Sequence, residues 1–235
     1  MIDLHTHIIP EFDDGSRSAS MSLDMLCQLK TAGFDSVVLT SHFYPHKISL
    51  SNYYIEREKA IKKFVIALEG KSELPHIYLG CELYLTPQIF NYSDINGLCL
   101  NKTNYILTEL PDSKGYSEQT YQYVCRLMND FSVIPVLAHI ERYDFLLDEK
   151  ILNKFIDLGC LTQINLTSLT QHEYKKKLLH FIEKGYISSI GTDSHSAPIK
   201  CMEIEEALSF INKRLGSDAI NDITYRSERI LQITS

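Results

Sequence analysis

Long apolar segments are absent from this sequence. Nowhere in its 235 residues is there a run of about 18 apolar residues, the length that a membrane-spanning helix needs. The first residues read MIDLHTH, without the basic and apolar regions that begin a signal peptide. We therefore expect neither a membrane span nor a signal peptide.

Closely spaced cysteines are also missing. The six cysteines are widely separated and form no C-x-x-C pair, so a disulfide framework is not indicated. Free thiols are typical of a reducing compartment, and we expect a cytoplasmic protein.

Positive charge is scarce. The chain carries 23 basic and 30 acidic residues, a formal net charge of −7. Its longest basic run, 175–177, lies between apolar positions and is typical of a solvated helix face. Nucleic-acid binding depends on clustered basic residues that neutralise phosphates, so we expect no nucleic-acid partner.

Short apolar runs alternate with helical patterns along the whole chain. The runs predicted as strands are Ile2–Ile8, Ser36–Thr40, His76–Leu85, Tyr105–Leu110, Ile134–His139, Leu161–Leu166 and Ile187–Gly191. Between several of them, apolar residues recur at helical spacing and a glycine follows, as at Gly33, Gly70, Gly159 and Gly185. Alternating strands and helices predict a parallel sheet. Seven such units without a break in composition predict one α/β domain over 1–235, closed or nearly closed into a barrel.

Residues that can bind metal stand where these strands end. The candidates are His5, His7, Asp14, His42, Glu82, Glu109, His139, Asp193 and His195. In an α/β barrel the carboxyl ends of the strands share one face, so we expect these scattered residues to converge. Side chains alternate along a strand, so His5 and His7 are predicted to point to the same side. The other histidines, at positions 46, 76, 172 and 180, do not share this placement.

The types of residue favour metal chemistry. Five imidazoles and four carboxylates without cysteine suit Mn²⁺, Fe²⁺ or Zn²⁺. Nine ligands exceed what one ion uses, so we expect two or three ions that share carboxylates. Single features have simpler explanations: Asp13-Asp14-Gly15-Ser16 alone is an ordinary turn and helix cap, and His42 alone is a hydrogen-bonded loop residue. The recurrence of candidates at the same place in successive units favours a metal centre.

The segments around these residues resemble the polymerase-and-histidinol-phosphatase (PHP) superfamily. They are MIDLHTHIIPEFDDGS, TSH at 40–42, GCELYLTP at 80–87, LTELP at 107–111, AHIERY at 138–143 and TDSH at 192–195. More narrowly, DDG, GCELYLTP, AHIERY and TQIN at 162–165 are similar to the bacterial manganese-dependent protein tyrosine phosphatases of capsule and exopolysaccharide gene clusters. The resemblance covers essentially the whole chain and implies the PHP fold, a single-domain distorted (β/α)7 TIM-like barrel.

The same resemblance implies a site with three metal ions, manganese being the expected metal. The first ion would be held by His5, His7, Glu82 and Asp193, the second by Glu82, Glu109 and His139, and the third by Asp14, His42 and His195. Many PHP relatives have histidine where this chain has Asp14 and Glu109, whereas the tyrosine phosphatase subgroup has the acids.

The resemblance also implies how phosphate is bound. Arg142 matches an arginine that the subgroup uses on the phosphate, and Lys200 stands where a second basic residue usually follows. Lysine is a point charge and cannot form a bidentate fork, so Lys200 is expected to hold phosphate less firmly than arginine would.

The implied reaction is hydrolysis of phosphotyrosine, with the C-terminal tail of a bacterial tyrosine kinase as the expected partner substrate. The nucleophile would be a metal-bound hydroxide, formed because the metal lowers the pKa of water toward about 7. Asp14, or a water near it, is a candidate proton donor. No cysteine has an arginine six positions downstream, which excludes the phosphate loop of thiol-based tyrosine phosphatases.

Two alternatives stay open. One is a small-molecule phosphatase of the same superfamily that acts on histidinol phosphate or a nucleotide. The other is a binding module that keeps the fold without catalysis. The sequence leaves the oligomeric state undetermined.

Overall fold

Strands and helices alternate as the sequence pattern predicts. The computed structural model describes residues 1–111 and 115–233. The strands are β1 (Ile2–Thr6), β2 (Ser36–Leu39), β3 (His42–Phe43), β4 (His76–Leu79), β5 (Glu82–Tyr84), β6 (Tyr105–Glu109), β7 (Ile134–Leu137), β8 (Leu161–Asn165) and β9 (Ser189–Gly191). Each of the seven predicted runs contains a strand, so that prediction is confirmed. β3 was not predicted, because two residues are too few to show an alternating pattern.

Helices follow most of the strands. They are α1 (Ala19–Thr31), α2 (Leu50–Leu68), α3 (Glu118–Phe131), α4 (Glu149–Leu158), α5 (His172–Glu183), α6 (Cys201–Leu215) and α7 (Asp218–Leu231). Ser18 caps α1 by accepting a hydrogen bond from the backbone of Met21, and Gly159, at φ 105°, ends α4. Within 1–111 and 115–233, no helix has both the length and the apolar character needed to cross a membrane.

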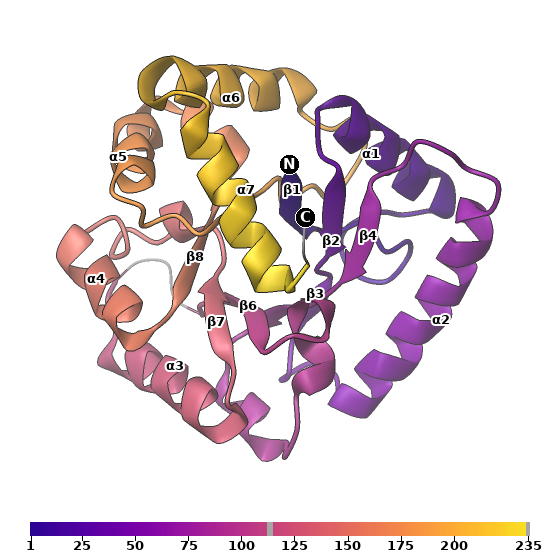
Figure 1. The fold of residues 1–235 in the computed structure, drawn as a ribbon. Coiled ribbons are helices and arrows are strands. Elements are labelled where there is room, and N and C mark those ends of the chain that lie inside the picture. The colour runs from indigo at the N-terminus through magenta and orange to yellow at the C-terminus, as the bar shows by residue number, and fades with distance from the viewer. Residues whose placement is uncertain (112–114, 234–235) are drawn as a thin grey trace.

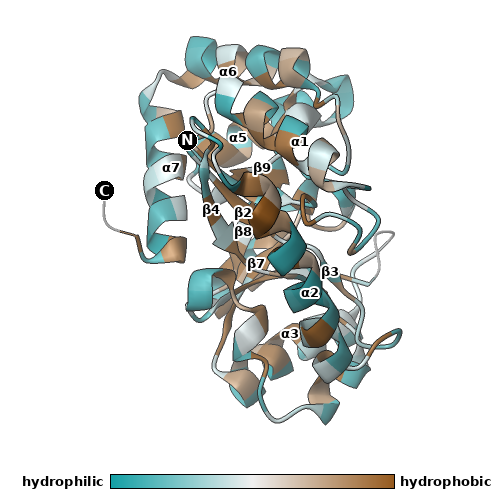
Figure 2. Ribbon diagram, turned by 90° about the vertical axis from the view of Figure 1, so that its right-hand side faces the viewer, coloured by the Kyte–Doolittle hydropathy of each residue, from teal (hydrophilic) through white to brown (hydrophobic). Residues whose placement is uncertain are grey.

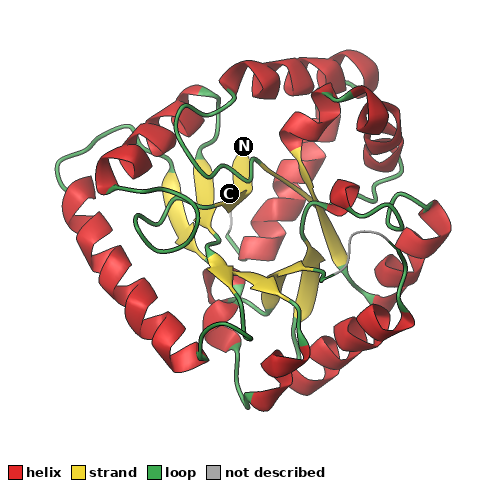
Figure 3. Ribbon diagram, turned by 180° about the vertical axis from the view of Figure 1, so that it is seen from behind, coloured by secondary structure: helices red, strands yellow, loops and turns green. Residues whose placement is uncertain are grey.

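The strands form a curled parallel sheet. One part has the order β1-β2-β4 and the other the order β3-β5-β6-β7-β8-β9, and every ladder is parallel. Figure 1 shows the helices as an outer layer around these strands, and Figure 3 shows the same arrangement from behind. The structure is therefore a mixed α/β fold with a half-barrel. The finer expectation of a full seven-unit barrel stays a prediction.

Apolar packing fills both faces of the sheet. The larger cluster joins strands to the outer helices and includes Leu26, Phe64 and Phe155. A smaller cluster joins β1, β2, β6 and β7 to α7, where Ile230 and Leu231 are buried. In Figure 2 the strands are mostly hydrophobic, whereas the helices alternate between hydrophobic and hydrophilic residues. Figure 1 shows α7 lying across one end of the sheet, which leaves the other end to the loops.

A buried carboxylate connects the first strand to the segment after the last. Asp3 accepts hydrogen bonds from the His5 backbone N (3.2 Å), the Thr192 backbone N (2.9 Å) and Thr192 Oγ1 (2.7 Å). Burial raises the pKa of Asp3 to about 6, although these hydrogen bonds act in the opposite direction. Asp3 thereby fixes the position of β1 relative to the residues that follow β9.

We expect Asp3→Ala to lower the free energy of unfolding by about 2–5 kcal/mol, because each buried donor left without an acceptor costs about 1–3 kcal/mol. Urea denaturation in the presence of a chelator measures this loss without a contribution from bound metal. Asp157→Ala, at an exposed position of α4, is the control and should stay within about 0.5 kcal/mol of the parent. An unchanged urea midpoint for Asp3→Ala would contradict the role of this carboxylate.

Candidate metal centre

The nine side chains singled out as metal ligands lie together, seven of them at or after the carboxyl ends of strands, while His42 and Glu82 begin the short strands β3 and β5. They come from β1 and the loop after it (His5, His7, Asp14), from β3, β5 and β6 (His42, Glu82, Glu109) and from the segments after β7 and β9 (His139, Asp193, His195). Their ligand atoms form three groups, each with atoms within 4.8 Å of one another, and His139 lies against the group that contains Glu109.

The first group consists of His5, His7, Glu82 and Asp193, all buried. His5 Nε2 lies 3.1 Å from His7 Nε2, 3.0 Å from Glu82 Oε2 and 3.4 Å from Asp193 Oδ1. His7 Nε2 lies 3.2 and 3.3 Å from the same two oxygens. Ligand atoms about 2.0–2.2 Å from one ion are about 3.0–3.5 Å from one another, so this spacing fits a single ion among the four residues.

Hydrogen bonds on the far side of three imidazoles determine which nitrogen faces the groups. His7 Nδ1 lies 2.9 Å from Asp13 Oδ2, His195 Nδ1 lies 2.8 Å from the Asp193 carbonyl, and His5 Nδ1 lies 3.2 Å from Gln163 Oε1. Burial would raise the pKa of Asp13, but the interaction with His7 and the hydrogen bonds from the backbone of Gly15 and His42 together outweigh burial and lower the pKa to about 2. Each of these oxygens is an acceptor, so each Nδ1 donates and each Nε2 presents a lone pair, as in metal-binding histidines.

The other two groups share residues with the first. The second consists of His42, Glu82 and Glu109, and the third of His7, Asp14, His42 and His195. Asp14 Oδ1 lies 3.7 Å from His42 Nε2 and 3.6 Å from His195 Nε2. His139 Nε2 lies 3.0 Å from Glu82 Oε1 and 3.9 Å from Glu109 Oε1. The resemblance implies that His139 binds the second ion. The distances also place His42 beside Glu82 and Glu109, the carboxylates of this ion.

Unsatisfied polar atoms show that these residues fit metal ions. Among the described residues, no hydrogen-bond partner exists for the buried atoms Glu82 Oε2, His42 Nδ1 and Glu109 Oε2 of the second group. Burial and then the negative charge of Glu82 raise the pKa of Glu109 to about 7, which reflects an excess of carboxylates in a small volume. Divalent cations would relieve both conditions, because they bind lone pairs and neutralise carboxylates.

The residues that hold the ligands in place were not predicted from the sequence. Asp13 accepts hydrogen bonds from His7 and from the His42 backbone N (3.0 Å). Gln163 accepts from the His139 backbone N (2.7 Å) and donates to Asn165 (3.0 Å). Asn165 in turn donates to Asp193 Oδ2 (3.1 Å). The sequence did contain a sign of this role: residues 163 and 165 are two positions apart on β8, so their side chains face the same side of the sheet.

The backbone approaches itself closely at two glycines. A Cβ on Gly15 would lie 2.1 Å from the His7 carbonyl oxygen, and one on Gly191 would lie 2.6 Å from His5 Cβ. These contacts require glycine and let the Asp14 loop and β9 pack against β1.

His139 and Asp193 adopt left-handed conformations, with φ of 32° and 53°. Such non-glycine residues cost about 1–3 kcal/mol each and persist where the surrounding structure holds them.

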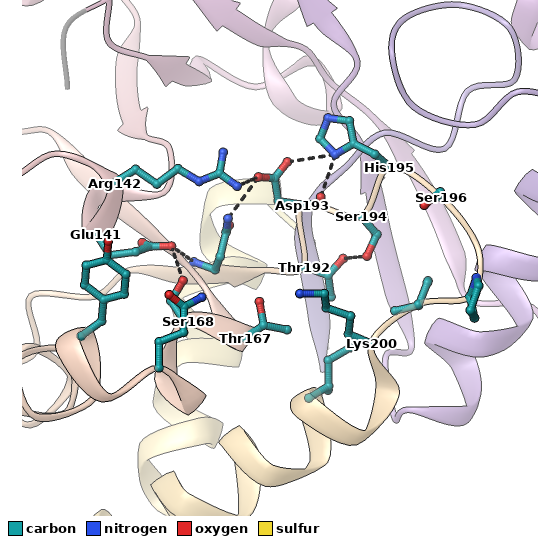
Figure 4. A pocket seen from close by; sticks show the side chains of 16 residues that line it. Glu141, Arg142, Thr167, Ser168, Thr192, Asp193, Ser194, His195, Ser196 and Lys200 are labelled. Atoms are coloured by element: carbon teal, nitrogen blue, oxygen red, sulfur yellow. Dashed lines mark hydrogen bonds and ion pairs between the residues drawn. The ribbon is translucent and has the colours of Figure 1, made fainter.

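Arg142 and Lys200 line a pocket beside the ligands. The pocket has a volume of about 410 Å³ and also includes Asp193 and His195 (Figure 4). Arg142 Nη2 donates to Asp193 Oδ2, and Lys200 Nζ lies 3.4 Å from Glu203 Oε2. Their side chains are 53% and 67% exposed, so both cations are accessible to an anion that enters the pocket.

The remaining histidines belong to none of the three groups. His76 begins β4 and His172 begins α5, both exposed, while His180 lies 3.2 Å from Glu149 Oε2. His46 differs from these three, because its exposed ring lies 5.9 Å from that of Tyr44 at the edge of the metal centre.

The family model of capsular polysaccharide synthesis proteins, CpsB/CapC, matches residues 1–232. The chain belongs to the CpsB/CapC family. This membership confirms the narrower resemblance that the sequence motifs indicated.

Two relatives and one solved structure extend the comparison of this CpsB/CapC chain. It is 27% identical over 239 residues to tyrosine-protein phosphatase CpsB of Streptococcus agalactiae, covering 95% of this chain and 94% of the relative. It is 27% identical over 243 residues to tyrosine-protein phosphatase YwqE of Bacillus subtilis, covering 99% and 92%. A chain from the crystal structures of Bacillus subtilis YwqE and Streptococcus pneumoniae CpsB, described as unique metal-dependent tyrosine phosphatases, matches with a TM-score of 0.77 and 24% identity. That match covers 100% of this chain and 96% of the other and shows the same fold.

Metal binding should stabilise this CpsB/CapC protein. An ion at about 100 times its dissociation constant adds about 2.7 kcal/mol to the stability. We therefore expect Mn²⁺ to raise the melting temperature of chelator-treated protein by about 5–10 °C. Glu82→Gln should lose most of this shift, because Glu82 belongs to two of the three groups. Glu183→Gln, at an exposed position of α5, should keep it. If Mn²⁺, Fe²⁺ and Zn²⁺ all left the melting temperature unchanged, the centre would not be a metal site.

Proposed function

We propose that this CpsB/CapC protein is a metal-dependent protein tyrosine phosphatase. The observation that carries this proposal is the cluster of buried imidazoles and carboxylates with an accessible arginine and lysine beside it. Family membership and the tyrosine-protein phosphatase names of the relatives support the same activity.

We infer that the nine candidate ligands hold three divalent ions, Mn²⁺ in preference to Fe²⁺ or Zn²⁺. Nitrogen and oxygen donors without thiolate suit these metals. When bound, the ions would activate a water molecule as the nucleophile and neutralise charge on the phosphoryl oxygens.

Side chains of this chain would bind and orient the substrate. The planar guanidinium of Arg142 can donate two parallel hydrogen bonds to phosphoryl oxygens, whereas Lys200 contributes a single mobile charge. Asp14, whose side chain is 65% exposed, or a water near it, is the proposed proton donor to the departing tyrosyl oxygen. A phenol has a pKa of about 10, so this leaving group needs only modest assistance.

We propose a phosphotyrosine-containing C-terminal tail of a bacterial tyrosine kinase as the substrate. The exposure of Arg142, Lys200 and Asp14 supports a segment that approaches from solvent rather than a metabolite held in an enclosed cavity. We also propose a cytoplasmic location, where the six free cysteines would stay reduced.

We further propose that 1–235, including 112–114 and 234–235 outside the described residues, forms one domain built on a distorted seven-unit barrel. β3 follows β2, and β5 follows β4, after only two residues, and both β2–β4 and β3–β5 pair in parallel, so we count each pair as one interrupted strand. Two interactions support contact between the first strand and the last: the bridge between Thr6 and Ser194, and the hydrogen bond from the Asp193 backbone N to the His5 carbonyl (2.8 Å).

The manganese-loaded protein should hydrolyse a phosphotyrosine peptide with a kcat/KM at least about tenfold above that for histidinol phosphate, since one mismatched substrate group is worth about 1–3 kcal/mol. Steady-state kinetics on both substrates measures the ratio. A preference for histidinol phosphate would make the protein a small-molecule phosphatase. If neither substrate were hydrolysed and His5→Ala bound the kinase tail as well as the parent does, the protein would be a binding module.

Arg142→Ala should lower kcat/KM on the peptide by about 100- to 1,000-fold, the usual cost of removing one preorganised donor from developing charge. Arg142→Lys should recover part of this loss, because it restores the charge without the fork. Lys200→Ala should cost about tenfold, and Lys200→Arg should equal or exceed the parent. Lys176→Ala, at an exposed position of α5, is the control. A loss of less than about threefold in Arg142→Ala would exclude its role on the phosphate.

A further inference from the structure

Three aromatic side chains stand at one edge of the metal centre. Tyr44, His46 and Tyr84, here called the aromatic rim, have ring centroids 5.5 Å (Tyr44–Tyr84), 5.9 Å (Tyr44–His46) and 5.8 Å (His46–Tyr84) apart. The ring of Tyr44 stacks on that of His42 at 4.8 Å. His42 belongs to the second and third ligand groups, so the aromatic rim is continuous with the metal centre.

Strand geometry puts both tyrosines just outside the ligands. Tyr44 comes two residues after His42, and Tyr84 comes two residues after Glu82 on β5. Side chains two apart on a strand point to the same side, and the second lies about 6.6 Å further along. The register of β5 with β6 also pairs Tyr84 with Glu109, a third candidate ligand. Each tyrosine therefore lies one side-chain layer beyond a ligand, toward solvent.

Two pockets of different character flank the ligand groups. The pocket of about 410 Å³ contains Arg142 and Lys200 and is mainly polar. The other, of about 820 Å³, has more apolar surface and is lined by Asp14, His42, Tyr44 and four lysines. Both pockets therefore carry cations, and Tyr44 is the residue of the aromatic rim that lines the larger one.

We propose that the aromatic rim binds the aryl ring of the phosphate monoester whose phosphoryl group lies at the metal centre. This inference rests on the proposed phosphatase function and assigns residues that favour aryl over alkyl substrates. In an aryl phosphate one ester oxygen separates the phosphorus from the ring, so the ring falls in the layer beyond the ligands. That layer holds Tyr44 and Tyr84, which are both half-buried.

Contacts already made by the tyrosines indicate how the ring would pack. Tyr44 stacks on His42, Lys47 Nζ lies 3.9 Å from the centroid of the Tyr44 ring, and the His46 ring meets it at an interplanar angle of 73°. Tyr84 Oη donates to the Pro111 carbonyl (3.2 Å), which orients that ring. Aromatic pairs favour edge-to-face contact, so the substrate ring is expected to pack edge-to-face against the rings of the aromatic rim.

Two non-hydrolysable ligands that differ only in the ring test the proposal. Isothermal titration calorimetry on manganese-loaded protein would compare benzylphosphonate, whose methylene group stands in for the ester oxygen, with methylphosphonate. We expect the parent to bind benzylphosphonate about three- to tenfold more tightly, the range of one or two aromatic contacts. Tyr44→Leu should lose most of this preference and keep its affinity for methylphosphonate, whereas Tyr44→Phe should retain the preference.

Two further variants complete the design. Tyr84→Leu should reduce the preference as well, because its ring forms the other half of the rim. Tyr225→Leu removes a 59% exposed tyrosine of α7 and should behave as the parent does. Methylphosphonate affinity also checks that each variant is folded and metal-loaded, since it depends on the metal centre and the cations alone.

The outcomes separate the two proposals. If the parent hydrolysed p-nitrophenyl phosphate but bound both phosphonates equally, the role of the aromatic rim would be overturned and the phosphatase function would stand. Full retention of the preference in both Tyr44→Leu and Tyr84→Leu would overturn the role of the rim in the same way. If the loaded parent hydrolysed no phosphate monoester, the proposed function would fail and the role of the rim with it.

Discussion

The buried carboxylate of Glu82 is the point on which the geometry of the site depends. Its Oε2 lies 3.0 Å from His5 Nε2, 3.2 Å from His7 Nε2 and 3.1 Å from His42 Nδ1, while Oε1 lies 3.0 Å from His139 Nε2. A carboxylate with 1% exposure opposes folding unless charges or hydrogen bonds compensate it. Burial acts against ionisation, yet the contacts with the rings of His5, His139 and His7 hold the pKa of Glu82 well below its ordinary value. Four imidazoles from distant parts of the chain therefore contact the two oxygens of this one carboxylate.

Polar residues behind the ligands turn this cluster into an ordered centre. Asp3 accepts a hydrogen bond from the backbone of β1, and Asp13 accepts one from the ring of His7. Gln163 connects His5 and His139 to Asn165. Ligands held by such hydrogen bonds lose little freedom when an ion binds, which favours affinity and a single geometry. The left-handed conformations near the site are tolerated because this network and the glycine contacts surround them.

The surroundings of the metal centre differ from one side to the other. Arg142 and Lys200 line one pocket, Tyr44 lines the other, and the Tyr84 ring lies 5.5 Å from that of Tyr44. A centre of this kind can hold a phosphoryl group between metal ions and cations while its ester group lies against aromatic rings. The preference for one kind of phosphate ester would then depend on the residues at the strand ends, because the same strands carry the candidate metal ligands and the aromatic rings.

The sequence by itself determined the seven strand-bearing runs, the parallel α/β class and the nine candidate ligands. These follow from local chemistry: apolar periodicity marks the elements, and parallel strands bring their carboxyl ends to one face. Only the tertiary structure decided that Glu82 and His42 are shared between groups, that Gln163 supports His5 across 158 positions and that Tyr44 and Tyr84 form a rim. Such contacts depend on strand register and on which face of each strand turns inward. A one-residue slip reverses that face, so a local pattern cannot specify them.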